Sequence, residues 1–395
     1  MHSGHGNIRW DIFCNVIDNF GDIGVCWRLA RQLAAEHEAR VCLWVDDLQS
    51  FQAMCPKLDT KRATQTVSQV IIRHWTQDFP DIPATDIPDV VIEAFACELP
   101  ENYLAALAKH PKKPRWINLD YLSAEDWVTG CHQKPSPHPR LPLTRYFFFP
   151  GFLPATGGLL RESGLLHQRD RWREENTITR RWQQLGQHLG HLPTQTGERI
   201  ISLFCYENPR LPELLQCWRE GGQPIHCLVP AGRILSQTSQ LPGLSSLSPG
   251  NSLRQGSLTL TALPFVPQED YDFLLWHCDL NFVRGEDSLV RAQWAARPLV
   301  WHIYPQEERA HLHKLSAFLD LYCRQLEKEA ARALRDFWQI WNGADDENMP
   351  QMHTAWQAFS RHLPALTQHA GKWCDELSSQ ADLAAQLVRF CEKPI

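Results

Sequence analysis

The chain has 395 residues, which favours two domains over one, and its 43% of hydrophobic residues are enough for ordinary cores. Lysine and arginine number 39 and aspartate and glutamate 45, which gives a formal charge of −6. The sequence contains no run of lysine and arginine that could bind along a phosphate backbone. This composition argues against nucleic acid as the main partner.

Predicted strands and helices alternate through the first part of the chain, which implies a parallel sheet with crossover helices. The strands are expected at 8–16, 40–45, 70–75, 89–94 and 115–120, and the helices at 25–37 and 101–109. A proline-rich loop follows over 134–156, with aromatic anchors at 146–152, and then a charged helix at 167–190.

A second alternating unit begins after a linker expected at 192–197. Its strands are expected at 199–205, 225–229, 258–263, 279–283 and 299–304, its helices at 211–220, 267–276 and 289–296, a surface loop at 237–255, and further helices over 307–392. The fold class is therefore α/β, in the GT-B arrangement of nucleotide-sugar transferases. Two Rossmann-like domains, 1–192 and 193–371, would face each other across a central cleft, with a helical C-terminal tail.

The tight polar loop between the first strand and the first helix holds two carboxylates, Asp18 and Asp22, among Gly21 and Gly24. Glycine allows close backbone approach, and active sites of α/β proteins form at the carboxyl ends of strands. The alternative is that Asp22 only caps the helix. The dinucleotide fingerprint G-x-G-x-x-G is absent here, so binding of NAD or FAD is disfavoured.

The segment 282–288 lies where a strand turns into a helix. Ser288 is expected to be the N-cap, and the free N–H groups of that helix end, together with the Arg284 guanidinium, would attract a diphosphate. Glu286 and Asp287 would accept hydrogen bonds from ribose, base or sugar hydroxyls, or position Arg284. The alternative is a capped helix with surface acids.

Aromatic and amide side chains close two other strands of the second unit. Phe204 and Tyr206 close one strand, and Phe265 and Gln268 close another. A ring at a strand end can stack on a nucleobase while an amide recognises its polar edge. Packing in the core is the alternative for each ring.

Several kinds of site are not indicated. The thirteen cysteines are odd in number and widely spread, and no two have the spacing C-x-x-C. The sequence therefore indicates neither a zinc knuckle nor a disulfide framework. His188, His191, His311 and His313 lack the spacing of a metal site, and no serine or cysteine nucleophile motif appears. With neither a signal-peptide pattern nor a run of about 18 apolar residues, we expect a cytoplasmic protein without a membrane segment.

The segments 18–24, 204–206, 265–268 and 284–288, in this order, resemble the EarP family of bacterial protein-arginine rhamnosyltransferases, over nearly the whole chain. The resemblance implies a GT-B fold and an inverting transfer of L-rhamnose from dTDP-β-L-rhamnose. The Asp18 and Asp22 pair could bind Mg²⁺, but Arg284 would supply the charge that a metal otherwise provides, so we expect no metal or other cofactor. The acceptor would be one arginine in the N-terminal KOW-like domain of elongation factor P, which is thereby activated to rescue ribosomes stalled at polyproline. By analogy, a last helix at about 372–395 would complete the first domain.

The resemblance also implies residue roles. Asp22 would be the general base, Asp18 its neighbour in acceptor handling, and Glu286 would lie near the transferred sugar or the acceptor. The donor nucleotide-sugar would be held by Phe204, Tyr206, Phe265, Gln268, Arg284, Asp287 and Ser288, with Tyr271 and Tyr304 as further lining residues. Two alternatives stay open, namely a GT-B enzyme with a small-molecule acceptor and a non-catalytic chaperone of the translation factor.

Overall fold

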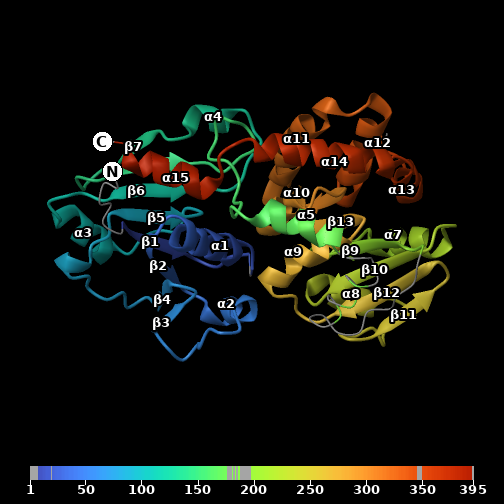
Figure 1. Ribbon diagram of the computed structural model, residues 1–395, viewed down its shortest axis with the longest axis horizontal. Coiled ribbons are helices and arrows are strands. Elements are labelled where there is room, and N and C mark those ends of the chain that lie inside the picture. The colour runs from blue at the N-terminus through green and yellow to red at the C-terminus, as the bar shows by residue number, and fades with distance from the viewer. Residues whose placement is uncertain are drawn as a thin grey trace. The chain divides into compact units, whose positions relative to one another are not determined.

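The computed structural model describes residues 8–18, 20–175, 197–344 and 349–393, together with the single positions 180, 183 and 186. The chain forms two compact units (Figure 1), the first made of Met1–Ser163 and Ser378–Ile395 and the second of Gly164–Leu377. The sequence predicted domain boundaries at 192 and 371. Except for Gly197, the linker predicted at 192–197 lies outside the described residues.

The first unit contains a sheet of eight strands in the order β3-β4-β2-β1-β5-β6-β8-β7, parallel except at the edge strands β3 and β7. The strands are β1 (Arg9–Cys14), β2 (Arg40–Val45), β3 (Thr64–Val67), β4 (Val70–His74), β5 (Val90–Ala94), β6 (Arg115–Leu119), β7 (Pro135–Pro137) and β8 (Thr144–Phe148). The helices are α1 (Gly21–Glu36), α2 (Leu48–Met54), α3 (Glu101–Lys109), α4 (Trp127–Cys131) and α15 (Leu383–Glu392).

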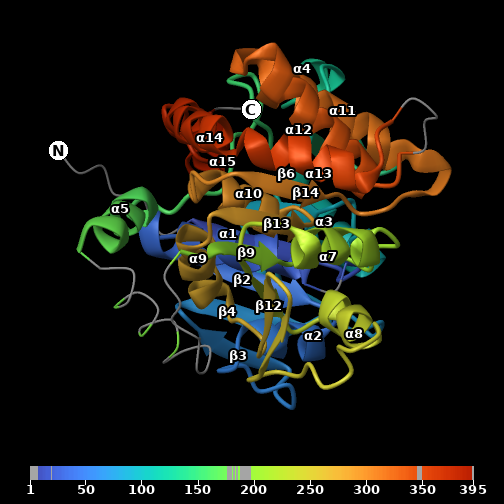
Figure 2. The same cartoon turned by 90° about the vertical axis from the view of Figure 1, so that its right-hand side faces the viewer.

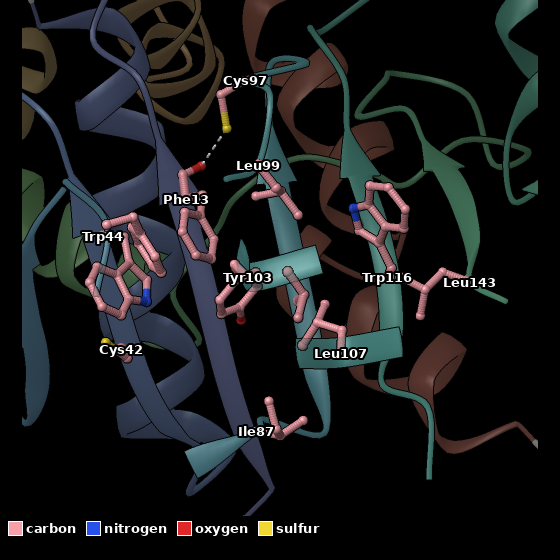
Figure 3. Packing of buried hydrophobic residues seen from close by; sticks show 12 residues of the cluster. Phe13, Cys42, Trp44, Ile87, Cys97, Leu99, Tyr103, Leu107, Trp116 and Leu143 are labelled. Atoms are coloured by element: carbon pink, nitrogen blue, oxygen red, sulfur yellow. Dashed lines mark hydrogen bonds between the residues drawn. The ribbon is translucent and has the colours of Figure 1, made fainter. Parts of the chain in front are cut away.

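Aromatic side chains fill one face of this sheet (Figure 3). The rings of Phe13 and Trp44 stack with centroids 5.6 Å apart, and Tyr103 packs edge-on to Phe13 at 4.8 Å. The buried carboxyl of Asp11 accepts hydrogen bonds from Trp44 Nε1 at 3.2 Å and from the Tyr103 hydroxyl at 2.9 Å. Burial raises the pKa of Asp11 to about 6. Both polar aromatic groups thus find a partner inside the core, as buried donors require.

The second unit contains a sheet of six strands in the order β11-β12-β10-β9-β13-β14, parallel except at the edge strand β11. The strands are β9 (Arg199–Leu203), β10 (Ile225–Pro230), β11 (Ser252–Gln255), β12 (Leu258–Leu263), β13 (Leu280–Arg284) and β14 (Leu299–His302). The helices are α5 (Leu165–Glu175), α7 (Leu211–Glu220), α8 (Arg233–Ser239), α9 (Gln268–His277), α10 (Asp287–Trp294), α11 (Ala310–Tyr322), α12 (Lys328–Trp341), α13 (Met352–Arg361) and α14 (Leu363–Ser378). Helices α7 and α9 cover opposite faces of this sheet (Figure 2), as right-handed crossovers in opposite directions require.

The predicted alternation of strands and helices is confirmed in both units, with several local corrections. The loop predicted over 134–156 contains the paired strands β7 and β8, because its aromatic run is a strand that pairs with β6. The loop predicted over 237–255 ends in the edge strand β11. Several strands are also shorter than predicted, so Phe204 lies beyond β9 and Tyr304 beyond β14.

The C-terminal helices belong to both units. An aromatic cluster joins α11, α12 and α14, with Trp338 and Tyr322 stacked at 6.3 Å and Trp373 edge-on to Tyr322 at 5.4 Å. Helix α15 packs in the first unit, where Leu383 N donates to Leu159 O at 3.0 Å. Among the described residues, no helix is long and apolar enough to span a membrane.

Candidate active site

The loop between β1 and α1 is folded back on the carboxylate of Asp22. Asp22 Oδ2 accepts hydrogen bonds from the backbone N–H groups of Ile17 and Asp18, both at 2.9 Å. Gly21 N donates to Asp18 O at 2.6 Å, which closes a tight turn before the helix. Phe20, and not Asp22, occupies the N-cap position of α1. The interpretation of Asp22 as a simple helix cap is therefore wrong, since its carboxylate shapes the loop instead.

A second carboxylate, which the sequence did not single out for a role, fixes the start of the same loop. Asp46 follows β2, the strand next to β1 in the sheet. Its Oδ1 accepts from Val16 N at 2.9 Å, and its Oδ2 accepts from Asn15 Nδ2 at 2.7 Å. The only sequence signal for this contact was an aspartate at the end of a neighbouring parallel strand.

Burial raises the pKa of Asp22, whose side chain is only 4% exposed. The negative charges of Asp18 and Asp46 raise this pKa further, while the two backbone N–H groups lower it, and the balance is a raised pKa. Desolvation thus dominates over hydrogen bonding at this carboxylate. A carboxylate with a raised pKa accepts a proton more readily near neutral pH.

The Asp18 carboxylate lies directly against the backbone of Gly21. A Cβ atom at position 21 would come within 2.8 Å of Asp18 Oδ2, closer than real Cβ contacts. Glycine at this position therefore lets the two carboxylates occupy one turn.

Other groups of the first unit lie at the same carboxyl edge of the sheet. Phe95 and Ala96 follow β5 with φ angles of 55° each, a left-handed conformation that is rare for residues other than glycine. The Phe95 ring stacks on Tyr121, which follows β6, with centroids 4.8 Å apart. Ile17, beside the aspartates, is 66% exposed.

In the second unit, Arg284 ends β13 and is buried beneath two aromatic rings of the loop after β9. Its guanidinium carbon lies 4.7 Å from the ring centroid of Phe204 and 4.9 Å from that of Tyr206. In the part of the chain that the structure describes, no carboxylate forms an ion pair with Arg284. Cation–π contacts with these two rings stabilise the buried charge.

The acidic residues after β13 do not position Arg284 by ion pairing, which is a correction of one sequence interpretation. Asp287 instead accepts a hydrogen bond from Gln268 Nε2 at 3.1 Å. Glu286 is the half-buried N-cap residue of α10 and makes no side-chain capping bond.

Ser288 is not the N-cap that the sequence predicted. It is the second residue of α10, and its hydroxyl accepts from Arg284 N at 3.0 Å and donates to Arg284 O. The serine thus fixes the backbone of Arg284. Between them Gly285 has a φ of 57°, and its carbonyl accepts from Trp301 Nε1 at 2.8 Å.

The remaining predicted residues lie around these groups. Tyr271 packs edge-on to Phe204 at 5.4 Å, and the 45% exposed Tyr304 packs edge-on to Tyr206 at 5.5 Å. Phe265 is half-buried in the turn between β12 and α9. The second unit thus contains every predicted donor-site residue and Glu286, while Asp18 and Asp22 belong to the first unit.

No group of histidine, cysteine or acidic residues in the described ranges could hold a metal ion. Two of the four histidines considered from the sequence, His188 and His191, lie outside those ranges.

Comparison with known proteins gives consistent matches over nearly the whole chain. The family model described as Elongation-Factor P (EF-P) rhamnosyltransferase EarP matches residues 10–392. The protein-arginine rhamnosyltransferases of Pseudomonas putida and Pseudomonas aeruginosa are 50% and 48% identical to this chain, and each alignment covers 96% of it and 98% of the relative.

Solved structures give the same picture. One described as "Structural basis for EarP-mediated arginine glycosylation of translation elongation factor EF-P" is 37% identical, with a TM-score of 0.68 over 97% of this chain and 98% of that one. Spinosyn rhamnosyltransferase SpnG is 11% identical, with a TM-score of 0.51 over 98% of this chain and 100% of that one, which shows likeness of fold alone. The predicted GT-B fold is thereby confirmed.

Substitution of Gly21 by alanine tests the crowding at the two aspartates. Alanine favours a helix over glycine by up to about 1 kcal/mol, while its Cβ would push the Asp18 carboxylate away. We expect the free energy of unfolding to change by less than about 1 kcal/mol and a crystal structure to show a displaced Asp18 carboxylate. Gly130→Ala in α4, where no atom lies within 4 Å of the new Cβ, is the control. An unmoved Asp18 would contradict the crowding.

Proposed function

Because this chain belongs to the EarP family of elongation factor P rhamnosyltransferases, we propose that it transfers L-rhamnose from dTDP-β-L-rhamnose to one arginine of translation elongation factor P, with inversion. It is a protein-arginine rhamnosyltransferase, as its relatives are. The proposed acceptor site is the N-terminal KOW-like domain of the factor. Since translation factors work in the cytoplasm, the enzyme is expected to act there.

The buried Asp22 carboxylate is the observation that carries the proposed chemistry. A free arginine side chain stays protonated and is a poor nucleophile. Asp18 and Asp22 would hold its guanidinium by charge-assisted hydrogen bonds and direct one nitrogen at the anomeric carbon. A new C–N bond then forms, the bond from the anomeric carbon to the diphosphate oxygen breaks, and Asp22 takes the proton from the guanidinium. One displacement inverts the anomeric centre.

The exposed Ile17 side chain supports the placement of the acceptor on the first unit. Its N–H group donates to Asp22, and its side chain is 66% exposed beside the two carboxylates. An arginine needs both kinds of surface, because its methylene stem is apolar while its head is charged.

Arg284, with the rings of Phe204 and Tyr206 that pack against it, would bind the donor. The leaving dTDP gathers negative charge, which the Arg284 guanidinium and the N-terminal end of α10 would stabilise. The half-buried ring of Phe265 and the amide of Gln268 suit the face and the polar edge of thymine. Because Arg284 supplies a permanent cation, we propose catalysis without a metal ion. Glu286 would contact the transferred sugar or the acceptor.

The first test is the intact mass of elongation factor P after incubation with dTDP-β-L-rhamnose and the enzyme. Wild type should add one deoxyhexose. Asp22→Asn keeps an oxygen for the Ile17 and Asp18 N–H groups but removes the base, so the rate should fall by about a hundredfold to ten-thousandfold. A wild type that binds the donor but leaves the factor unmodified would favour the small-molecule acceptor, and equal rates would exclude Asp22 as the base.

The raised pKa of Asp22 gives a pH prediction. Because the carboxylate is the active form, kcat/KM should fall as the pH drops through this raised pKa, which lies above the ordinary aspartate value of 3.8. Asp46→Asn removes a negative charge that raises the pKa, so the acid limb should move to lower pH. Asp47→Asn, in the N-cap of α2, is the matched control and should leave the limb in place. An acid limb that does not move in Asp46→Asn would contradict the assignment.

Arg284→Lys separates charge from shape at the proposed donor site. Lysine keeps the charge but loses the planar fork that lies over Phe204 and Tyr206. We expect dTDP to bind at least about tenfold more weakly by calorimetry. Arg254→Lys, an exposed change on the edge strand β11, is the control and should bind dTDP as wild type does. Unchanged affinity in Arg284→Lys would remove Arg284 from the donor site.

A further inference from the structure

The end of β14 lies beside Arg284 and is held by an asparagine from a distant helix. His302, the last residue of β14, pairs in register with Arg284. The side chain of Asn342, the C-cap residue of α12, accepts from Ile303 N at 3.0 Å and donates to Trp301 O at 2.8 Å. The two residues that flank His302 are therefore fixed by one amide.

Both N–H donors and the oxygen of the Asn342 amide have partners within the fold. It is 7% exposed, and its Nδ2 also donates to Trp338 O in the last turn of α12, at 2.8 Å. A buried amide with its partners in place holds a unique arrangement, and loss of one partner leaves a costly unpaired group.

The same helix end also holds the loop after β9. Asn208, which is 1% exposed, donates from Nδ2 to Trp341 O at 2.8 Å. The end of α12 therefore anchors two loops that each carry a tyrosine: Tyr206 lies two residues before Asn208, and Tyr304 directly follows Ile303.

These anchors converge on Tyr206. The His302 ring packs edge-on to Tyr206 with centroids 5.4 Å apart, and Tyr304 packs edge-on to it at 5.5 Å. Tyr206 in turn lies 4.9 Å from the Arg284 guanidinium carbon. A continuous set of contacts thus runs from Asn342 through His302 and Tyr206 to Arg284.

His302 is suited to this place because it stays neutral. It is 5% exposed, and burial, together with electrostatic repulsion by neighbouring Arg284, lowers its pKa to about 3. The neutral ring can pack on Tyr206 without adding a second cation next to Arg284.

We infer that Asn342 and His302 are positioning residues of the donor site, which hold the Tyr206 ring against the Arg284 guanidinium. This inference rests on the proposed function for the identity of the donor. Neither residue needs to touch the donor, because each acts through Tyr206.

Binding of dTDP, and the KM values of donor and acceptor, test this inference in the full-length enzyme. Asn342→Asp keeps the size of the side chain but sets an oxygen against the carbonyls of Trp301 and Trp338. His302→Ala removes the ring that packs on Tyr206, whereas His302→Phe keeps an aromatic edge there. We expect about three- to tenfold weaker dTDP binding and a higher donor KM in Asn342→Asp and His302→Ala, an unchanged acceptor KM, and recovery in His302→Phe.

A matched control separates positioning from stability. His226→Ala removes another buried histidine of the same sheet, which lies near the start of β10 and forms a hydrogen bond with Thr261. Burial lowers the pKa of His226 as well, to about 4. His226→Ala should lower the unfolding temperature and leave dTDP binding unchanged. If His302→Ala lowers the unfolding temperature but binds dTDP as wild type does, the inference is overturned. This test does not depend on Asn342→Asp, which could fail to fold. A wild-type protein that does not bind dTDP overturns the proposed donor, and the inference with it.

Discussion

The two hydrogen bonds from the backbone N–H groups of Ile17 and Asp18 to the Asp22 carboxylate are the constraint on which the first unit's site depends. They oppose the cost of burying an ionised group and leave a raised pKa as the balance. They also force the chain into a tight turn, in which only glycine at position 21 leaves room for a second carboxylate. These two hydrogen bonds therefore shape the loop and partly offset the rise in pKa that burial causes at Asp22.

Both units place their charged group where the strand order of the sheet reverses. In the first sheet, β1 lies between β2 on one side and β5 on the other, and Asp22 follows β1. In the second sheet, β9 lies between β10 on one side and β13 on the other. Tyr206 follows β9, and Arg284 is the last residue of β13. Loops diverge at such a point, so side chains from two strand ends can share one ligand. The same rule thus explains a carboxylate pair in one unit and a cation under aromatic rings in the other.

The sequence predicted the parts of this arrangement that are local. Alternating strands and helices, and the polar segments that follow them, indicated both the fold and the position of Asp22 and Arg284. Contacts between distant segments left no such pattern. Asp46 contacts the first loop from the end of a neighbouring strand. Three consecutive polar residues at the start of α10 all resemble caps, so the hydrogen bonds of Ser288 were predicted wrongly. Asn342 sits at a helix end where asparagine is common for local reasons alone.

The C-terminal helices, of which the sequence predicted only that the last would complete the first domain, stabilise the elements that carry each proposed site. In the first unit, Asp382 at the N-cap of α15 accepts from Gln32 Nε2 at 3.0 Å, and Gln32 lies on α1, the helix that contains Asp22. In the second, the end of α12 binds the loops after β9 and β14. Loops at strand ends have few backbone partners of their own and are usually mobile. A reaction between two polar, charged substrates needs these loops fixed before binding, because ordering them afterwards would weaken affinity. The helical tail therefore stabilises the loops of both proposed sites.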